Sequence, residues 1–322
     1  MTSTGLIADI GGTNIRLALA TSECFHNLRI YKCTNFSSLL DAVRFYLKDI
    51  KFEGEILCGL LAVAGPVTGD KFELTNYSWK FSINELSREL GIDSLEVVND
   101  FVAVSLGVPV IEAANLLQIG PGKRKVGEPA VVIGPGTGLG AGSLIQYDGV
   151  DIAIPGEGGH ITMPAKTQRQ FNIFQVLLKD KYHHISAERV CSGKGLENLY
   201  QAIIALDQVG GPSERTAEEI SRLAISGECK VCEECLDLMC GFLGVVAGDL
   251  AVMLCATGGV YIAGGIPAKL GDYFIKSRFR EEFEDKGRFS SYLKGISTCL
   301  IADSHVALHG LHHELVQGHK LG

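Results

Sequence analysis

A carboxylate and two glycines lie close together near the N-terminus, at Asp9 and Gly11-Gly12. Residues 5–7 and 15–20 on either side are apolar, which predicts a tight turn between two strands. Consecutive backbone N–H groups in such a turn can bind an anion, and glycine lets a ligand come close. Because Asp9 would repel a bare phosphate, the pattern suggests a phosphate with a divalent cation beside it. An ordinary β-hairpin with a Gly-Gly turn is the alternative.

A second glycine-rich turn is expected at residues 134–138, with the sequence Gly-Pro-Gly-Thr-Gly. Apolar residues 130–133 precede it and residues 139–145 follow it, as around the first turn. We interpret the two segments as an internal structural repeat, with one hairpin opening each half of the chain. Two such turns suggest a nucleotide held between two domains.

Asn99 and Asp100 follow an apolar run, residues 95–98, which we interpret as a buried strand. Ligands of α/β sheets bind beyond the carboxyl ends of such strands. In phosphoryl transfer, a carboxylate there can orient a hydroxyl and take its proton as the hydroxyl attacks the γ-phosphate. The alternative is that Asp100 only caps a helix beginning at Phe101.

Glu157 and His160 lie in the segment Pro-Gly-Glu-Gly-Gly-His. Their spacing occurs in helical di-metal sites, but the surrounding glycines and proline exclude a helix here. A loop that holds a carboxylate and an imidazole where backbones come close suits hydrogen bonds to a polyol. A plain surface loop is the alternative.

Two further segments carry weaker signals when each is taken alone. Glu188 precedes Arg189, and the local pattern favours the solvated start of a helix. Gly264-Gly265 follows the apolar run 259–263, so this turn could let an adenine ring lie against the backbone.

Cysteines and histidines were considered as metal ligands. Cys229, Cys232 and Cys235 form two overlapping C-x-x-C spacings at the start of a helix expected to reach residue 256, but the second ligand pair of a zinc ribbon is missing. Cys58, Cys255 and Cys299 have apolar neighbours in the sequence. The histidines after residue 304 fall on a helix and tail without an evident acidic partner, so we interpret them as surface residues.

The elements that position these residues alternate along the chain. Apolar runs at 28–33, 56–64, 71–74, 95–98, 259–263 and 295–302 predict strands, and helical periodicity is seen at 37–48, 82–90 and 306–316. Residues 167–256 are largely helical by the same criterion. Alternating strands and helices predict an α/β fold.

Composition limits the class of protein. The 322 residues are enough for two domains, and 46% apolar residues allow a large core. A net charge of −8 argues against nucleic acid. Residues 236–260 are the most apolar stretch, but Asp237 and Asp249 interrupt it, and the N-terminus lacks the pattern of a signal peptide. We therefore expect a soluble cytosolic protein with ten reduced cysteines.

Taken together, these motifs resemble the bacterial-type ATP-dependent glucokinases, a non-zinc group of the hexokinase-like and actin-like ATPase superfamily. The resemblance covers nearly the whole chain and keeps the order of the family's motifs. The matching segments are residues 8–19, 64–70, 74–79, 98–101, 134–140, 155–160, 186–190, 258–266 and 283–289.

The resemblance implies a role for each segment. The first phosphate turn would be Ala8, Asp9, Ile10, Gly11, Gly12 and Thr13, with Asp9 near Mg²⁺ through water. The second would include Gly134, Gly136, Thr137 and Gly138, and Gly264-Gly265 would border the adenosine of ATP. Glucose hydroxyls would be bound by Asn99, Asp100, Glu157, His160 and Glu188, with Asp100 as the base for the 6-hydroxyl.

The family fold implies a two-domain actin-like ATPase (ribonuclease H-like) architecture. Residues 1–110 plus 301–322 would form a small α/β domain, and residues 111–300 a larger α+β domain, around a cleft that closes on glucose. Family members are commonly homodimers that carry out the first step of glycolysis in the cytoplasm.

One departure separates this chain from the related ROK kinases and repressors. Those proteins have a cysteine-rich zinc loop soon after their counterpart of the Glu157 segment, and residues 161–170 contain no cysteine here. Three alternative functions are left open by the sequence: a kinase for another hexose, a polyphosphate-dependent enzyme, or a non-catalytic sugar sensor on the same fold.

Overall fold

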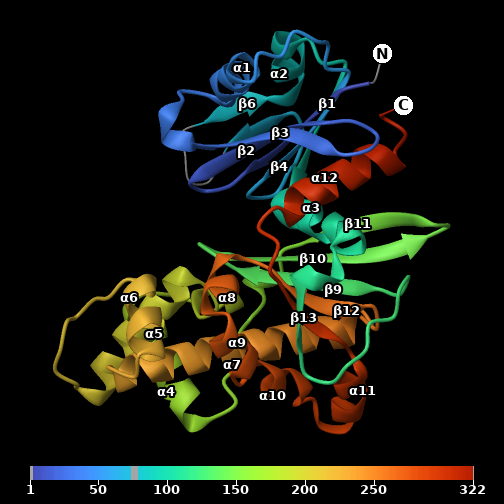
Figure 1. The fold of residues 1–322 in the computed structure, drawn as a ribbon. Coiled ribbons are helices and arrows are strands. Elements are labelled where there is room, and N and C mark those ends of the chain that lie inside the picture. The colour runs from blue at the N-terminus through green and yellow to red at the C-terminus, as the bar shows by residue number, and fades with distance from the viewer. Residues whose placement is uncertain (1–2, 74–78, 322) are drawn as a thin grey trace. The chain divides into compact units, whose positions relative to one another are not determined.

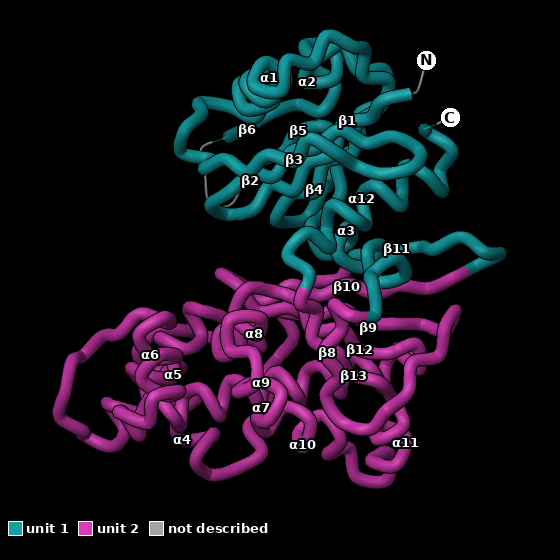
Figure 2. Tube along the Cα trace, viewed as in Figure 1, with its two compact units in different colours: residues 1–113, 147–155, 303–322 teal, residues 114–146, 156–302 magenta. Residues whose placement is uncertain are grey.

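The computed structural model describes residues 3–73 and 79–321. The chain forms two compact units, shown in Figure 2. Unit 1 contains residues 1–113, 147–155 and 303–322, and unit 2 contains residues 114–146 and 156–302. The domains expected from the sequence were residues 1–110 plus 301–322 and residues 111–300. They put residues 147–155 in the larger domain, whereas the structure groups this segment with unit 1. Within unit 1, that segment is bound to the C-terminal helix, because Gln317 donates from its Nε2 to the Asp151 carbonyl over 2.8 Å.

Unit 1 is built on a five-stranded sheet. Its strand order is β3 (Phe25–Lys32), β2 (Asn14–Ala20), β1 (Gly5–Ile10), β4 (Cys58–Val63) and β7 (Ser94–Asn99). The β1–β2 pair is an antiparallel hairpin, and β1, β4 and β7 run parallel. The expectation that residues 95–98 form a buried strand is wrong beyond Leu95, because β7 lies at the edge of the sheet.

Helices and a small ribbon complete unit 1 (Figure 1). They are α1 (Leu39–Asp49), α2 (Ile83–Leu90), α3 (Asp100–Gly107) and α12 (Val306–Gln317), with the β5–β6 pair (Lys71–Glu73 and Lys80–Ser82). The sequence motif at 74–79 lies outside the described residues except for Trp79. Helices α3 and α12 pack at a close crossing, where a Cβ on Gly310 would meet the Ala103 carbonyl oxygen at 1.9 Å. This crossing fixes the helix that begins at Asp100.

Unit 2 is built on a second sheet. The order of its strands is β10 (Leu139–Tyr147), β9 (Ala130–Pro135), β12 (Gly259–Ile262), β13 (Thr298–Ile301) and β8 (Leu116–Ile119), while β11 (Val150–Gly156) belongs up to residue 155 to the 147–155 segment of unit 1. The β9–β10 pair is antiparallel, and β9, β12 and β13 run parallel. Apart from the added β8, strand order and direction from the hairpin outward repeat those of unit 1, so the predicted internal repeat is confirmed.

The helices of unit 2 surround its long central helix, α7 (Lys230–Met253). The others are α4 (Gln168–Asp180), α5 (Gly193–Asp207), α6 (Ala217–Ile225), α8 (Gly265–Leu270), α9 (Asp272–Lys276), α10 (Phe279–Glu284) and α11 (Ser290–Gly295). Short 3-10 turns occur at Cys33–Asn35, Val108–Val110, Ala113–Asn115, Gly158–His160, Ala187–Arg189 and Gly287–Phe289. Helix α7 is long and apolar enough to cross a membrane, but 83% of its most apolar 18-residue window is buried, as in a core helix.

The expectation that the C-terminal histidines lack an acidic partner is wrong. The C-terminal histidines have partners within unit 1: His309 Nε2 lies 3.3 Å from an Asp303 carboxylate oxygen, and His313 Nε2 lies 2.9 Å from the Asp151 carboxylate. Asp303 is near these histidines in sequence, and Asp151 reaches them only through the fold. Cys255 is exposed because it follows the end of α7, although its sequence neighbours are apolar.

Candidate active site

The first glycine-rich turn joins β1 to β2, as the sequence predicts. The Gly11 N–H donates to the Asn14 carbonyl over 3.0 Å, and the Thr13 carbonyl accepts from the Cys33 N–H over 3.0 Å. These two bonds hold the turn, while Gly12 and Thr13 are exposed. The turn therefore presents backbone to a ligand on a fixed frame.

Asp9 lies at the base of this turn and forms an ion pair across the hairpin. Its Oδ2 lies 2.8 Å from Arg16 Nη1, and the strand register places the two residues opposite each other. The Asp9 side chain is 14% exposed. Burial raises the pKa of the Asp9 carboxyl, and the Arg16 guanidinium opposes this shift.

Asn99 and Asp100 lie at the carboxyl ends of the parallel strands, the same end of the sheet as the first turn. Ile10, Val63 and Asn99 are in register on three adjacent parallel strands, so Asn99 lies two strand spacings, about 10 Å, from the end of β1. Asn99 is the N-cap of α3: its Oδ1 accepts from the Phe101 N–H at 2.8 Å, and its Nδ2 donates to the Gly65 carbonyl at 3.2 Å.

Asp100 is the first residue of α3 and is half-buried. Its Oδ1 also accepts from the Phe101 N–H, at 3.0 Å. Asn99 and Asp100 thus share the Phe101 N–H at the start of α3, and Asp100 directly follows the carboxyl end of β7. A carboxylate held by a helix N-terminus at a strand end can orient a hydroxyl.

The second glycine-rich turn joins β9 to β10 in unit 2. Gly136 donates from its N–H to the Gly138 carbonyl over 2.8 Å and accepts at its carbonyl from the Gly193 N–H over 2.9 Å. Gly193 is the first residue of the 15-residue helix α5, so the positive end of that helix adjoins the turn. Gly264, with φ of 92°, packs against the same turn, where a Cβ would lie 2.5 Å from the Pro135 carbonyl oxygen.

Glu188 contacts the second turn directly. It lies in the 3-10 turn Ala187–Arg189, and its Oε2 accepts from the Leu139 N–H over 3.1 Å. A Cβ on Gly138 would lie 2.4 Å from that oxygen, so glycine is needed for this approach. The local interpretation of Glu188 as a solvated helix start is wrong, because the contact is between segments far apart in sequence.

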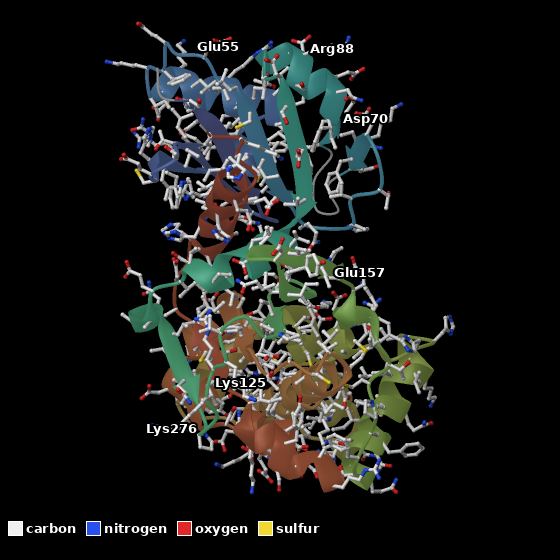
Figure 3. The ribbon with its side chains drawn as sticks, turned by 90° about the vertical axis from the view of Figure 1, so that its right-hand side faces the viewer. Glu55, Asp70, Arg88, Lys125, Glu157 and Lys276 are labelled. Atoms are coloured by element: carbon white, nitrogen blue, oxygen red, sulfur yellow. The ribbon has the colours of Figure 1, made fainter. Side chains whose placement is uncertain are left out.

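Glu157 and His160 lie on the exposed segment after β11, where Figure 3 labels Glu157. The prediction that they are not on an α-helix is confirmed, and a single 3-10 turn, Gly158–His160, holds them. Their side chains are 59% and 64% exposed, with Glu157 Oε2 3.8 Å from His160 Nε2. A backbone bridge between Thr162 and Ser186 ties this segment to the Glu188 turn.

The sequence-predicted residues thus fall into two sets, one in each unit. Unit 1 groups Asp9, Asn99 and Asp100 at one end of its sheet, and unit 2 groups Glu157, His160 and Glu188 around the second turn.

Arg16, the ion-pair partner of Asp9, was not identified from the sequence. The signal was available, because in a hairpin with four residues between the paired Ile10 and Ile15, position 9 lies opposite position 16.

Within the described residues, no cluster of three or more His, Cys, Asp or Glu side chains is arranged to hold a metal ion. One buried carboxylate at a phosphate-type turn nevertheless fits Mg²⁺, which usually keeps several waters and takes one or two carboxylates plus substrate phosphates. Asp9 is such a carboxylate.

A sheet order shared by two units, each opening with a glycine-rich hairpin, defines the class: a sugar kinase of the actin-like ATPase fold. A crystal structure of glucokinase from an Antarctic psychrotroph has this fold, with a TM-score of 0.87 and 34% identity, covering 98% of this chain and 100% of that one. The glucokinase family model matches residues 6–318. The chain belongs to the glucokinase family and is an ATP-dependent hexose kinase.

Two sequence relatives support the assignment. The glucokinase of Nitrobacter hamburgensis is 44% identical over 311 residues, which is 97% of both chains. The bifunctional protein glk of Burkholderia thailandensis is 42% identical over 307 residues, which is 95% of this chain but 47% of that protein. The chain therefore spans about half the length of its bifunctional relative.

Proposed function

We propose that this chain transfers the γ-phosphoryl group of MgATP to the 6-hydroxyl of glucose, producing glucose 6-phosphate and ADP in the first step of glycolysis. The observation that carries the proposal is the position of Asp100. This carboxylate stands at the end of a parallel strand, on a capped helix N-terminus, at the edge that also carries the first glycine-rich turn.

Asp100 acts as the base in this proposal. It accepts a hydrogen bond from the 6-hydroxyl, and the hydroxyl oxygen attacks the γ-phosphorus in line with the bond to the departing ADP oxygen. A new P–O bond forms as that bond breaks, and the hydroxyl proton passes to the Asp100 carboxylate. Asp100 accepts this proton as a carboxylate at the first position of α3.

Sugar recognition is assigned to Asn99, Asp100, Glu157, His160 and Glu188. Carboxylates accept hydrogen bonds from hydroxyls, while the amide and imidazole can donate or accept, so this set suits a polyol. The contact between Glu188 and the Leu139 N–H supports the assignment, because it holds the Glu188 carboxylate beside the second glycine-rich turn.

Nucleotide binding is assigned to the two turns and their neighbours. The residues are Ala8, Asp9, Ile10, Gly11, Gly12 and Thr13 in the first turn, Gly134, Gly136, Thr137 and Gly138 in the second, and Gly264 and Gly265 beside the adenosine. Asp9 would hold Mg²⁺ through water, since Mg²⁺ usually keeps several waters of its hydration shell. When bound, the ion neutralises charge on the phosphate oxygens.

The same assignment extends to organisation and location. We infer a small domain at residues 1–110 plus 301–322, with which residues 147–155 group, a larger one formed by the rest of 111–300, a homodimeric assembly and a cytoplasmic enzyme. Analytical ultracentrifugation of the purified chain tests the assembly, because a monomer at micromolar concentration would contradict it.

A substrate panel tests the function itself. ADP formation is coupled to NADH oxidation with glucose, mannose, fructose and N-acetylglucosamine as acceptors, and with ATP or polyphosphate as donor; polyphosphate turnover is read as glucose 6-phosphate formed. We expect the largest kcat/KM for glucose with ATP. A larger value for another sugar would identify a different hexose kinase, and glucose binding without turnover would identify a sensor.

A further inference from the structure

The overlapping C-x-x-C segment begins helix α7, outside the residues assigned to catalysis. Cys229 is the N-cap residue of this 24-residue helix, and Cys232 lies in its first turn. Cys229 is partly exposed, whereas Cys232 is fully buried. A partly exposed thiol beside a buried one at a helix N-terminus is the arrangement of a reactive cysteine and its resolving partner.

The two thiols are close enough to perturb each other. Burial raises the pKa of the Cys229 thiol, but the backbone amide and the thiol of Cys232, with the Val231 amide, lower it by more, so the net shift is downward. Burial, together with the neighbouring Cys229, raises the pKa of Cys232 to about 12. The pKa of the partly exposed thiol is therefore shifted down and that of the buried thiol up.

The charges around the pair favour a thiolate on Cys229. The Arg215 guanidinium lowers the pKa of both thiols, and its Nε is held by the Tyr200 hydroxyl over 3.0 Å. Glu219 acts in the opposite direction on Cys232. Lys230 is paired with Glu233 at 2.7 Å, which neutralises the nearest lysine on the helix itself.

We propose that Cys229 and Cys232 are a redox-active pair that forms a disulfide when the protein meets a peroxide. The Cys229 thiolate attacks one oxygen of hydrogen peroxide, the O–O bond breaks, and a sulfenic acid and hydroxide result. The Cys232 sulfur then attacks the Cys229 sulfur, and water leaves with the Cys232 proton. In sum, two thiols and one peroxide give one disulfide and two waters.

Cys232 is the resolving residue because of its position. Residues three apart lie on one face of a helix, so Cys229 at the N-cap and Cys232 in the first turn are neighbours on that face. Cys235 lies one turn deeper and is fully buried, so the thiolate would have to cross a turn of helix to reach it.

The sequence offers a direct assay, because trypsin cleaves between the two cysteines at Lys230. Peptide 223–230 contains Cys229 alone, and peptide 231–269 contains Cys232 and three further cysteines. The folded full chain is treated with hydrogen peroxide, alkylated, digested and analysed by mass spectrometry. We expect these peptides to appear joined, two hydrogens lighter than their sum, and to separate on reduction.

Two variants identify the partner. Cys232→Ser should reduce the linked species at least tenfold, and the matched control Cys235→Ser should leave it at the wild-type level. Should Cys232→Ser fail to fold, digestion of the wild type after Glu233 and Glu234 separates the two candidate partners instead. Oxidation confined to the exposed Cys24 or Cys255, or a link from Cys229 to Cys235, would overturn the proposal.

Discussion

The sheets of the two units have the same strand order in four equivalent strands, yet they bring a carboxylate to their glycine-rich turns in different ways. In unit 1 the carboxylate belongs to the hairpin itself, because Asp9 lies on β1 and pairs with Arg16 on β2. In unit 2 the hairpin has no such residue. Glu188 arrives from a separate 3-10 turn and accepts from the Leu139 N–H.

This difference separates two kinds of positioning. The Asp9–Arg16 pair is fixed by strand register alone, so it forms whenever the hairpin forms. The Glu188 contact needs the α5 N-terminus and the bridge between Thr162 and Ser186 to hold a distant segment in place. A duplicated framework can thus carry different chemistry, with metal binding assigned to one turn and sugar binding beside the other.

The largest expected effect concerns the base in unit 1. Asp100→Asn should lower kcat by about 10²–10⁴-fold, because the proton acceptor is lost, while glucose still binds. Steady-state kinetics and glucose titration by intrinsic fluorescence measure the two quantities. Asp93→Asn, at an exposed position just before β7, is the matched control and should behave as wild type. Near-normal turnover of Asp100→Asn would contradict the assignment of Asp100 as the general base.

The next effect tests the first turn. Asp9→Ala should reduce kcat/KM for MgATP by roughly 10²-fold, since an interaction with a charged group is lost at the phosphate site, and should leave glucose affinity nearly unchanged. Titrating Mg²⁺ at fixed ATP should show a higher requirement. Equal loss of ATP and glucose binding would mean that the Asp9–Arg16 pair serves only to hold the hairpin.

Glu188→Gln should show the reverse pattern. Loss of the charge should raise KM for glucose by roughly 10-fold or more, because hydrogen bonds to charged groups contribute about 1.5–3 kcal/mol. The amide oxygen can still accept from Leu139, so the second turn should keep its shape and KM for ATP should change little. A rise in KM for ATP alone would place Glu188 with the nucleotide and not with the sugar.

Alanine at a close helix crossing should cost a similar amount of stability in each unit. A Cβ at Gly310 would meet the Ala103 carbonyl oxygen at 1.9 Å, and one at Gly244 would meet the Phe279 carbonyl oxygen at 2.2 Å. Alanine at either position should lower the free energy of unfolding by about 1–3 kcal/mol. Gly295→Ala, where no atom lies within 4 Å, is the control. Urea denaturation measures all three, and a neutral Gly310→Ala would mean that α12 can shift freely.

The smallest effect is a pH-dependent one in unit 2. Arg169 hydrogen bonds lower the pKa of Asp207, with Nη–O distances of 2.6 Å. A carboxyl with a lowered folded pKa stabilises the fold above its unfolded pKa, and the contribution disappears as pH falls through the folded value. Because both side chains are about one-third exposed, screening limits Asp207→Asn to a loss of about 0.5–1 kcal/mol. Urea denaturation at pH 7 and below pH 4 should show that the difference in unfolding free energy between the wild type and Asp207→Asn becomes smaller at the lower pH.

Much of the fold followed from local pattern. Apolar runs and glycine-rich turns predicted both hairpins, and the repeat between them predicted two similar halves. Strand ends were predicted to within a few residues, because β-structure buried on its faces leaves an unbroken apolar run. Edge position was not predictable in this way, and β7 proved to be less buried than residues 95–98 indicate.

The candidate site was less evident from local sequence. Asp9 and Asp100 were found because each follows or ends a strand, where α/β proteins bind ligands. Glu188 had no local signal, and its partner Leu139 is 49 residues away. The C-terminal histidines were misjudged for the same reason, since His313 meets Asp151 only when α12 packs beside that segment.

By itself, then, the sequence determined the strands, the two glycine-rich turns, the pairing of Asp9 with its own hairpin and the family resemblance, because these depend on neighbours or on motif order. Tertiary structure alone decided that Glu188 touches the second turn, that Cys232 is buried behind a partly exposed Cys229, and that residues 147–155 belong with the C-terminal helix. Those contacts join segments that no periodicity relates, and their formation depends on the packing of the whole unit.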